Sequence, residues 1–98
     1  MQDTKCFLCG TDATCSETQG IFVRFYCEGS CGRYVVSRAA MRQIESSASS
    51  QTLKQSWSKE AALAQKKEMI LFLHLDDQRQ LKAERISRDD KLWSETPW

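Results

Sequence analysis

Hydrophobic and polar side chains alternate most regularly in GIFVRFYC, residues 20–27. β-Branched and aromatic residues in such an alternation are typical of a strand with two different faces. The predicted strand carries Ile21, Val23 and Phe25 on one face, and Phe22, Arg24 and Tyr26 on the other. A shorter apolar run, RYVV at residues 33–36, predicts a second strand.

The pattern changes to a helical period directly after the second run. Ser37 is a favourable N-cap residue, and RAAMRQIES follows it at residues 38–46. Ala40, Met41 and Ile44 form the apolar stripe of this segment. The sequence therefore predicts a short helix that packs through one face.

The second half of the chain begins after a serine-rich joint, ESSASSQT at residues 45–52. The following segment is rich in alanine and lacks glycine and proline, which predicts a helix from about Ser58 to Leu75. Its MILFL run, residues 69–73, is apolar on every side, so we expect it to be buried. A strand over Met69 to Leu75 is the alternative.

The last third of the chain has weaker signals. Asp77 and Gln80 match a capping box, which predicts a further helix to about Ser87. The end, RDDKLWSETPW, has little intrinsic structure. Together with the serine-rich joint, these patterns predict two parts, residues 1–45 and a helical C-terminal part with an aromatic tail, residues 46–98.

Composition and charge restrict the class of protein. The chain has 98 residues, of which 41% are hydrophobic and 28% are charged, as expected for one modest globular core. Fourteen Lys and Arg oppose thirteen Asp and Glu, so a net charge of +1 creates no general attraction to nucleic acid or to an anionic membrane. No apolar run is long enough for a signal peptide or a membrane span, and we expect a cytoplasmic protein without a membrane partner.

Cysteine spacing provides the strongest chemical signal. Cys6 and Cys9 form a C-x-x-C turn, and Cys27 and Cys31 form a turn that is one residue longer, with seventeen residues between the pairs. Such turns direct two sulfurs to one point, and Zn²⁺ prefers four tetrahedral ligands. The four cysteines are therefore predicted to hold a structural Zn²⁺, although iron would suit the same four sulfurs.

Other uses of these cysteines are less well supported. An odd total of five cysteines and a reducing compartment argue against structural disulfides. A thioredoxin-type dithiol needs a strand and a helix around the C-x-x-C turn, and too few residues precede Cys6. Cys15 lies in a turn-like stretch, GTDATCSETQG, and is expected to be a surplus thiol.

The two cysteine turns and the strands around them resemble a zinc ribbon over about residues 4–45. CGRYVVSRAAM, residues 31–41, also resembles the second knuckle of small ribbons in bacterial and phage proteins. A treble-clef finger is less similar, because RYVV separates the second cysteine pair from the helix. The resemblance implies a small α+β fold, with a metal-stabilised zinc ribbon followed by two or three helices. It also implies a bacterial or phage accessory or regulatory protein, without specifying an activity.

The expected ligand set argues against catalysis. Four cysteines leave no open position on the metal, whereas a catalytic zinc keeps one for water. His74 is the only histidine and is interpreted as a core or boundary residue. Ser56 and Ser58 are interpreted as helix caps or polar linker residues. We therefore expect a non-enzymatic module with no small-molecule substrate.

Protein binding is the main functional expectation. The apolar run is larger than a short helical appendage needs, and tryptophan is enriched at the centres of interfaces. The predicted contact residues, for a protein partner or for a homo-oligomer, are Leu71, Phe72, Trp93 and Trp98. Alternatively, both tryptophans fold back onto the ribbon.

Nucleic-acid binding is the alternative function. Arginines near aromatic residues are typical of surfaces that bind phosphates and stack bases. The candidate contacts are Arg24, Arg33, Arg38 and Arg42. Alternatively, the aromatic rings pack inside the protein and the arginines pair with Glu28 and Glu45.

Overall fold

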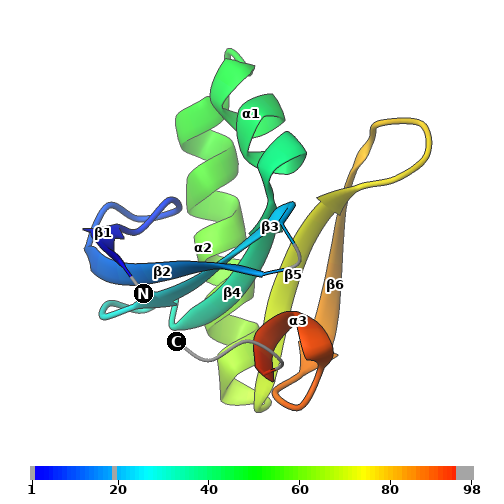
Figure 1. Ribbon diagram of the computed structural model, residues 1–98. Coiled ribbons are helices and arrows are strands. Elements are labelled where there is room, and N and C mark those ends of the chain that lie inside the picture. The colour runs from blue at the N-terminus through cyan, green and yellow to red at the C-terminus, as the bar shows by residue number, and fades with distance from the viewer. Residues whose placement is uncertain (1, 19, 95–98) are drawn as a thin grey trace.

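A computed structural model describes residues 2–18 and 20–94 of the chain (Figure 1). The described strands form one six-stranded sheet, and two helices of nine and seventeen residues lie against it. In chain order the elements are β1 (Gln2–Lys5), β2 (Asp12–Thr18), β3 (Phe22–Cys27), β4 (Arg33–Ser37), α1 (Arg38–Ser46), α2 (Ser50–Lys66), β5 (Met69–Leu75), β6 (Leu81–Ser87) and α3 (Lys91–Ser94).

The strands follow one another across the sheet in chain order, from β1 to β6. β1 to β4 form an antiparallel meander, and β5 pairs with β6 as an antiparallel hairpin. β4 and β5 are the exception, because they run parallel and are connected through α1 and α2. A parallel connection needs such a crossover, since the chain must return to the end of the sheet where β4 began.

Both faces of the sheet are covered in its centre. α1 and α2 lie on one face, where most buried side chains form a single core, and α3 lies on the other face (Figure 1). The smaller core beneath α3 consists of Val35, Ile70, Phe72 and Trp93. Because β4 and β5 are covered on both sides, most of their residues are buried and none is exposed.

Three sequence predictions are confirmed. The alternating run forms β3, and RYVV forms most of β4. The short helix begins and ends where predicted, and the Ser37 hydroxyl accepts a hydrogen bond of 3.1 Å from the amide of Ala40. Local signals suffice in these segments because the cap and the alternation are properties of neighbouring residues.

The predicted helix from about Ser58 to Leu75 is wrong at both ends, because α2 begins earlier, at Ser50, and does not extend past Lys66. The alternative strand over Met69 to Leu75 is correct. α2 ends at Lys66, Glu68 adopts a positive φ of 60°, and β5 begins at Met69. The MILFL run is apolar throughout because β5 lies inside the sheet. Its alternate side chains enter the two cores, Leu71 and Leu73 on one face and Ile70 and Phe72 on the other.

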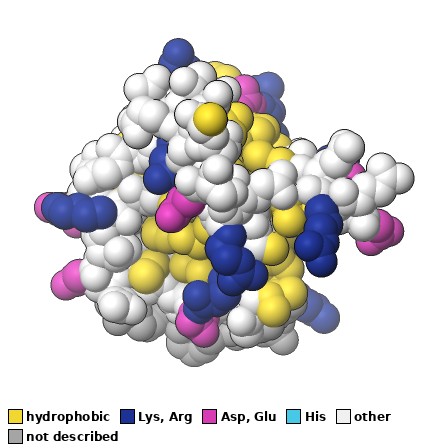
Figure 2. Space-filling model, turned by 90° about the horizontal axis from the view of Figure 1, so that it is seen from above, with side chains coloured by type: hydrophobic (Ala, Val, Ile, Leu, Met, Phe, Trp, Pro, Cys, Tyr) yellow, Lys and Arg dark blue, Asp and Glu magenta, His cyan; other side chains and the backbone are white. Residues whose placement is uncertain are grey.

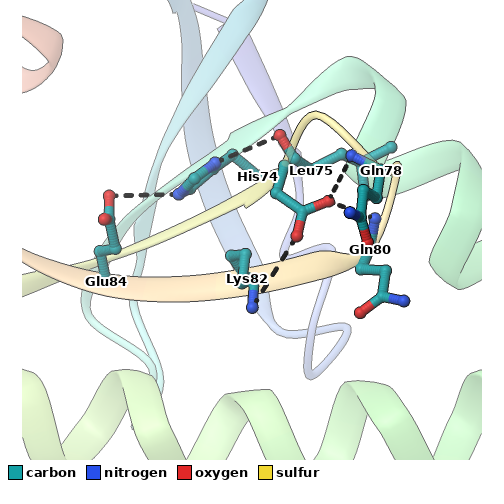
Figure 3. Close-up of polar contacts among 7 residues, drawn as sticks. His74, Leu75, Gln78, Gln80, Lys82 and Glu84 are labelled. Atoms are coloured by element: carbon teal, nitrogen blue, oxygen red, sulfur yellow. Dashed lines mark hydrogen bonds and ion pairs between the residues drawn. The ribbon is translucent and has the colours of Figure 1, made fainter.

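The capping-box prediction is also wrong, because residues 81–87 form the edge strand β6 rather than a helix. Asp76 makes the local contacts instead of Asp77. Its carboxylate accepts hydrogen bonds of 2.9 Å from the amides of Gln78 and Gln80, which closes the β5–β6 turn (Figure 3). The turn-like stretch around Cys15 is likewise a strand, β2, paired with β1 and β3.

The predicted fold of a zinc ribbon followed by two or three helices is therefore wrong, although the α+β class fits. The serine-rich joint, residues 45–52, overlaps the end of α1 and the beginning of α2. β4 precedes the joint and β5 follows it, yet Tyr34 to Val36 pair with Leu71 to Leu73 in one sheet. None of the helices in the described part of the chain has the length and apolar content needed to cross a lipid bilayer.

Candidate metal centre

The first cysteine turn connects β1 to β2. Cys6 directly follows β1, and its amide donates a hydrogen bond of 2.7 Å to the carbonyl of Thr11. The amide of Gly10 donates to the carbonyl of Cys6 at 2.9 Å, with Gly10 at a φ of +79°. This tight turn holds Cys9 beside Cys6, and a glycine suits the left-handed conformation that closes it.

The second cysteine turn connects β3 to β4 in a similar way. Cys27 is the last residue of β3, and its amide donates to the carbonyl of Gly32 at 2.7 Å. The amide of Gly29 donates to the Cys27 sulfur at 3.3 Å. Such N–H groups stabilise a thiolate, which is the form of cysteine that binds metal.

The antiparallel sheet brings the two turns together. β2 pairs with β1 on one side and with β3 on the other, so the Asp12 end of β2 lies next to both turns. Ala13 is opposite Cys27 in the register. The amide of Glu28 donates to the carbonyl of Asp12 at 3.0 Å, which connects the second turn to the beginning of β2.

The four sulfurs of Cys6, Cys9, Cys27 and Cys31 lie within 4.8 Å of one another, and the Cys9 and Cys27 sulfurs are 3.4 Å apart. Four sulfurs around a tetrahedral Zn²⁺ are separated by about 3.8 Å, since each Zn–S bond is about 2.3 Å long. None of the five cysteines, all of which are described, forms a disulfide. The residues present therefore fit a tetrahedral metal ion.

Other side chains contact the sulfurs from outside the cluster. Ser58 Oγ in α2 lies 2.9 Å from Cys31 Sγ, and the Tyr34 hydroxyl in β4 lies 3.1 Å from Cys6 Sγ. The Cys9 thiol donates to Thr11 Oγ1 at 3.2 Å. Such contacts orient the ligands and adjust their basicity. The sequence indicated neither contact, because each residue is distant in the chain from the cysteine it contacts. Ser58 lies inside α2, so its interpretation as a helix cap or linker residue is wrong.

α2 also covers the second turn. The amide of Arg33 donates to Gln65 Oε1 at 3.2 Å. That oxygen would lie 1.3 Å from a Cβ atom at position 32, so a larger residue there would displace the Gln65 side chain. Gly32 in addition has a φ of +64°, which disfavours other residues. α2, which the sequence analysis placed in a separate C-terminal part, therefore packs directly on the cysteine cluster.

The cysteines perturb one another's ionisation. The pKa of Cys6 is lowered to about 4, chiefly because the Cys31 thiol forms a hydrogen bond with it. The same hydrogen bond and burial raise the pKa of Cys31, and burial raises the pKa of Cys27 to about 11. The protonated thiols of Cys27 and Cys31 thus stabilise the thiolate of Cys6. A divalent cation would take over this role, because metal ligands bind as thiolates.

The fifth cysteine lies outside this cluster. Cys15 is in β2, opposite Gln2 of β1 and Phe25 of β3, and its side chain is half-buried. It is absent from the group of four sulfurs in the described part of the chain. This placement agrees with its interpretation as a surplus thiol.

The residues predicted to bind a protein partner lie mostly inside the structure. Leu71 is in the core beneath α1 and α2, and Phe72 and Trp93 are in the core beneath α3. Trp98 lies outside the described residues. Trp93 thus folds back onto the sheet, as the alternative interpretation of the tryptophans expected.

The four candidate arginines have different environments. Arg24 is buried, and donates to the carbonyl of Trp93 at 2.6 Å and to the Ser16 hydroxyl at 2.8 Å. Arg33 lies over the rings of Tyr26 and Trp93. The remaining two are on α1, where Arg38 pairs with Glu17 rather than with Glu28 or Glu45, and Arg42 is exposed.

His74 is half-buried in β5, outside the cysteine cluster. Its ring stacks on Phe72 with centroids 4.6 Å apart. Its Nε2 atom lies 3.1 Å from a carboxylate oxygen of Glu84 in the neighbouring strand (Figure 3). These contacts agree with a residue at the boundary of the core.

The centre consequently has the ligands and the short distances between sulfurs of a four-cysteine metal site, consistent with a zinc-ribbon-like motif. Its surroundings differ from a ribbon, because a six-stranded sheet and α2 enclose it. Comparisons of the chain with protein-family models, with curated proteins and with solved structures give no significant match.

Proposed function

We propose that this protein is a non-enzymatic binding module whose fold depends on one structural Zn²⁺. The observation that carries the proposal is the meeting of four cysteine sulfurs within 4.8 Å. They come from two backbone turns, and α2 contacts one of them through Ser58. A bound ion would thereby connect β1, β3, β4 and α2, and hold the meander against the long helix.

The proposed ion is zinc because four thiolates form a closed tetrahedral set that is typical of structural zinc sites. When bound, Zn²⁺ would supply a fixed divalent charge that keeps all four cysteines ionised. The chain's own residues provide the orientation: Gly29 and Ser58 bond to the sulfurs of Cys27 and Cys31, respectively.

A binding role is supported over catalysis by the ligand set, which leaves no position for water or substrate on the metal. His74 is engaged with Phe72 and Glu84. The ligand class expected from the sequence is a protein. A protein partner would have to contact residues other than Leu71, Phe72 and Trp93, because these are buried.

The metal proposal is tested by elemental analysis of the purified protein and of two cysteine variants. We expect one zinc per chain in the wild type, and a tetrahedral thiolate spectrum after replacement by Co²⁺. Cys9→Ser should abolish stoichiometric binding and cooperative unfolding, because about 10 to 16 kcal/mol of binding free energy stabilises small zinc folds.

Cys15→Ser is the matched control, because it removes a thiol outside the cluster. It should retain one zinc per chain. Iron in place of zinc, or full zinc content in Cys9→Ser, would contradict the proposal.

A further inference from the structure

A cavity of about 570 Å³ opens at the N-terminal end of α1, and none of the four clustered cysteines lines it. Its apolar lining includes Phe22, Phe72 and Leu75. Its polar lining includes Arg38, Arg42 and His74. Figure 2 views the molecule from above, and on this face hydrophobic side chains are exposed with Lys or Arg side chains beside them. The volume is within the range of small-molecule sites, about 300 to 1,000 Å³.

Ile21 forms an exposed part of the cavity wall. It is 60% exposed, the largest exposure among the large hydrophobic residues of the described chain. The carbonyl of Ile21 accepts a hydrogen bond of 3.0 Å from the amide of Arg38, which fixes this residue beside the first turn of α1. An apolar side chain is thus held in solvent next to an apolar cavity.

The charges around the cavity are unfavourable without a ligand. The first turn of α1 contains no acidic residue, although the positive end of the helix dipole favours one there. Arg38 occupies the first helical position, and Arg42 follows four residues later, where two like charges repel each other. Positions that go against such local electrostatic preferences of a helix are typical of functional sites.

Only part of this positive charge is neutralised within the described chain. Arg38 pairs with Glu17, and His74 contacts Glu84. The described residues provide no ion pair for Arg42, and no Asp or Glu lines the cavity. Arg42 also lines a second hollow beside the β5–β6 turn together with Arg79, so further positive charge lies close to the opening.

We propose that this cavity binds a small amphipathic anion. Its apolar or aromatic body lies against Ile21, Phe22 and Leu75, and its anionic group lies at Arg42 and the beginning of α1. The helix dipole and a charge-assisted hydrogen bond from the guanidinium both stabilise an anion at this position. This site lies apart from the metal centre and goes beyond the proposed structural role of zinc.

The proposal is tested with 1-anilinonaphthalene-8-sulfonate, an aromatic anion, added to the full-length protein as purified. Fluorescence titration should show saturable binding of one probe per chain. N-phenyl-1-naphthylamine has the same rings without the sulfonate and should bind more weakly. NMR shift changes should centre on Ile21, Ala39 and Arg42.

Arg42→Gln should weaken binding of the sulfonate about 10-fold, and Arg42→Glu about 100-fold, because a hydrogen bond to a charged group contributes about 1.5 to 3 kcal/mol. Neither change should alter binding of the neutral probe. Arg88→Gln is the matched control, since Arg88 is exposed and lies outside the cavity. It should leave both affinities unchanged.

Several results would overturn the proposal. These are equal affinity for the two probes, equal weakening by Arg42→Gln and Arg88→Gln, or shift changes centred on another surface. A dimer in sedimentation experiments that dissociates in Ile21→Glu would show that a second copy of the chain covers the cavity, and would also overturn it.

Discussion

The hydroxyl of Ser58 in α2 lies 2.9 Å from the sulfur of Cys31, the last of the four clustered cysteines. This contact joins the long helix to the second cysteine turn. Gln65, two turns further along the same helix, accepts a hydrogen bond from the amide of Arg33 just after that turn. We therefore expect metal binding at the cluster and the docking of α2 to be coupled, since each would position groups that the other needs.

Ser58→Ala should weaken zinc binding about 10- to 100-fold, the usual effect of removing an outer hydrogen bond from a metal ligand. Competition with a chromophoric zinc chelator measures this change. Ser56→Ala is the control, because Ser56 is exposed in the same helix. Equal affinity in the two variants would show that the contact with Cys31 is incidental.

Gly32→Ala should lower the free energy of unfolding by about 1 to 3 kcal/mol, because Gly32 has a φ of +64° and its Cβ would overlap Gln65. Urea unfolding of the zinc-loaded protein measures the loss. Gly10→Ala separates the two causes, since Gly10 has a φ of +79° but no atom within 4 Å of its Cβ. We expect a smaller loss for Gly10→Ala, and partial rescue of Gly32→Ala by Gln65→Ala.

Arg24→Ala should destabilise the protein by about 2 to 5 kcal/mol. The change leaves the Trp93 carbonyl and the Ser16 hydroxyl without their charged donor and removes a buried side chain. Equilibrium unfolding in urea checks this value. Arg88→Ala, at an exposed position, should stay within about 0.5 kcal/mol of the wild type. A similarly small effect for Arg24→Ala would contradict a structural role.

Asp76→Ala should loosen the β5–β6 turn. The amides of Gln80 and Gln78 lower the pKa of the Asp76 carboxyl by donating to it, so its folded pKa lies below its unfolded value. Its stabilising contribution is consequently complete above the unfolded pKa, including at pH 7, and is lost as the pH falls through the folded pKa. At pH 7, hydrogen exchange at these two amides should accelerate in Asp76→Ala. Unchanged exchange, or equal acceleration in the control Asp77→Ala, would refute the assignment.

Local sequence signals were sufficient where neighbouring residues decide the structure. Ser37 caps α1 directly, and the alternation in residues 20–27 forms β3. The spacing of Cys6, Cys9, Cys27 and Cys31 also anticipated their meeting, because each pair lies on its own short turn. Residues 12–18 had a turn-like composition, and their strand depends on pairing with two neighbours.

The sequence by itself determined the two cysteine turns, the strands β3 and β4 on either side of the second turn, and the first helix, since each follows from side chains only a few residues apart. Only the tertiary structure decided that residues 69–75 form an inner strand and that α2 covers the cluster. An apolar run such as MILFL suits either a buried helix or a buried strand. The choice depended on partners in β4 and β6, whose backbone groups and side chains are distant in the chain but adjacent in the sheet.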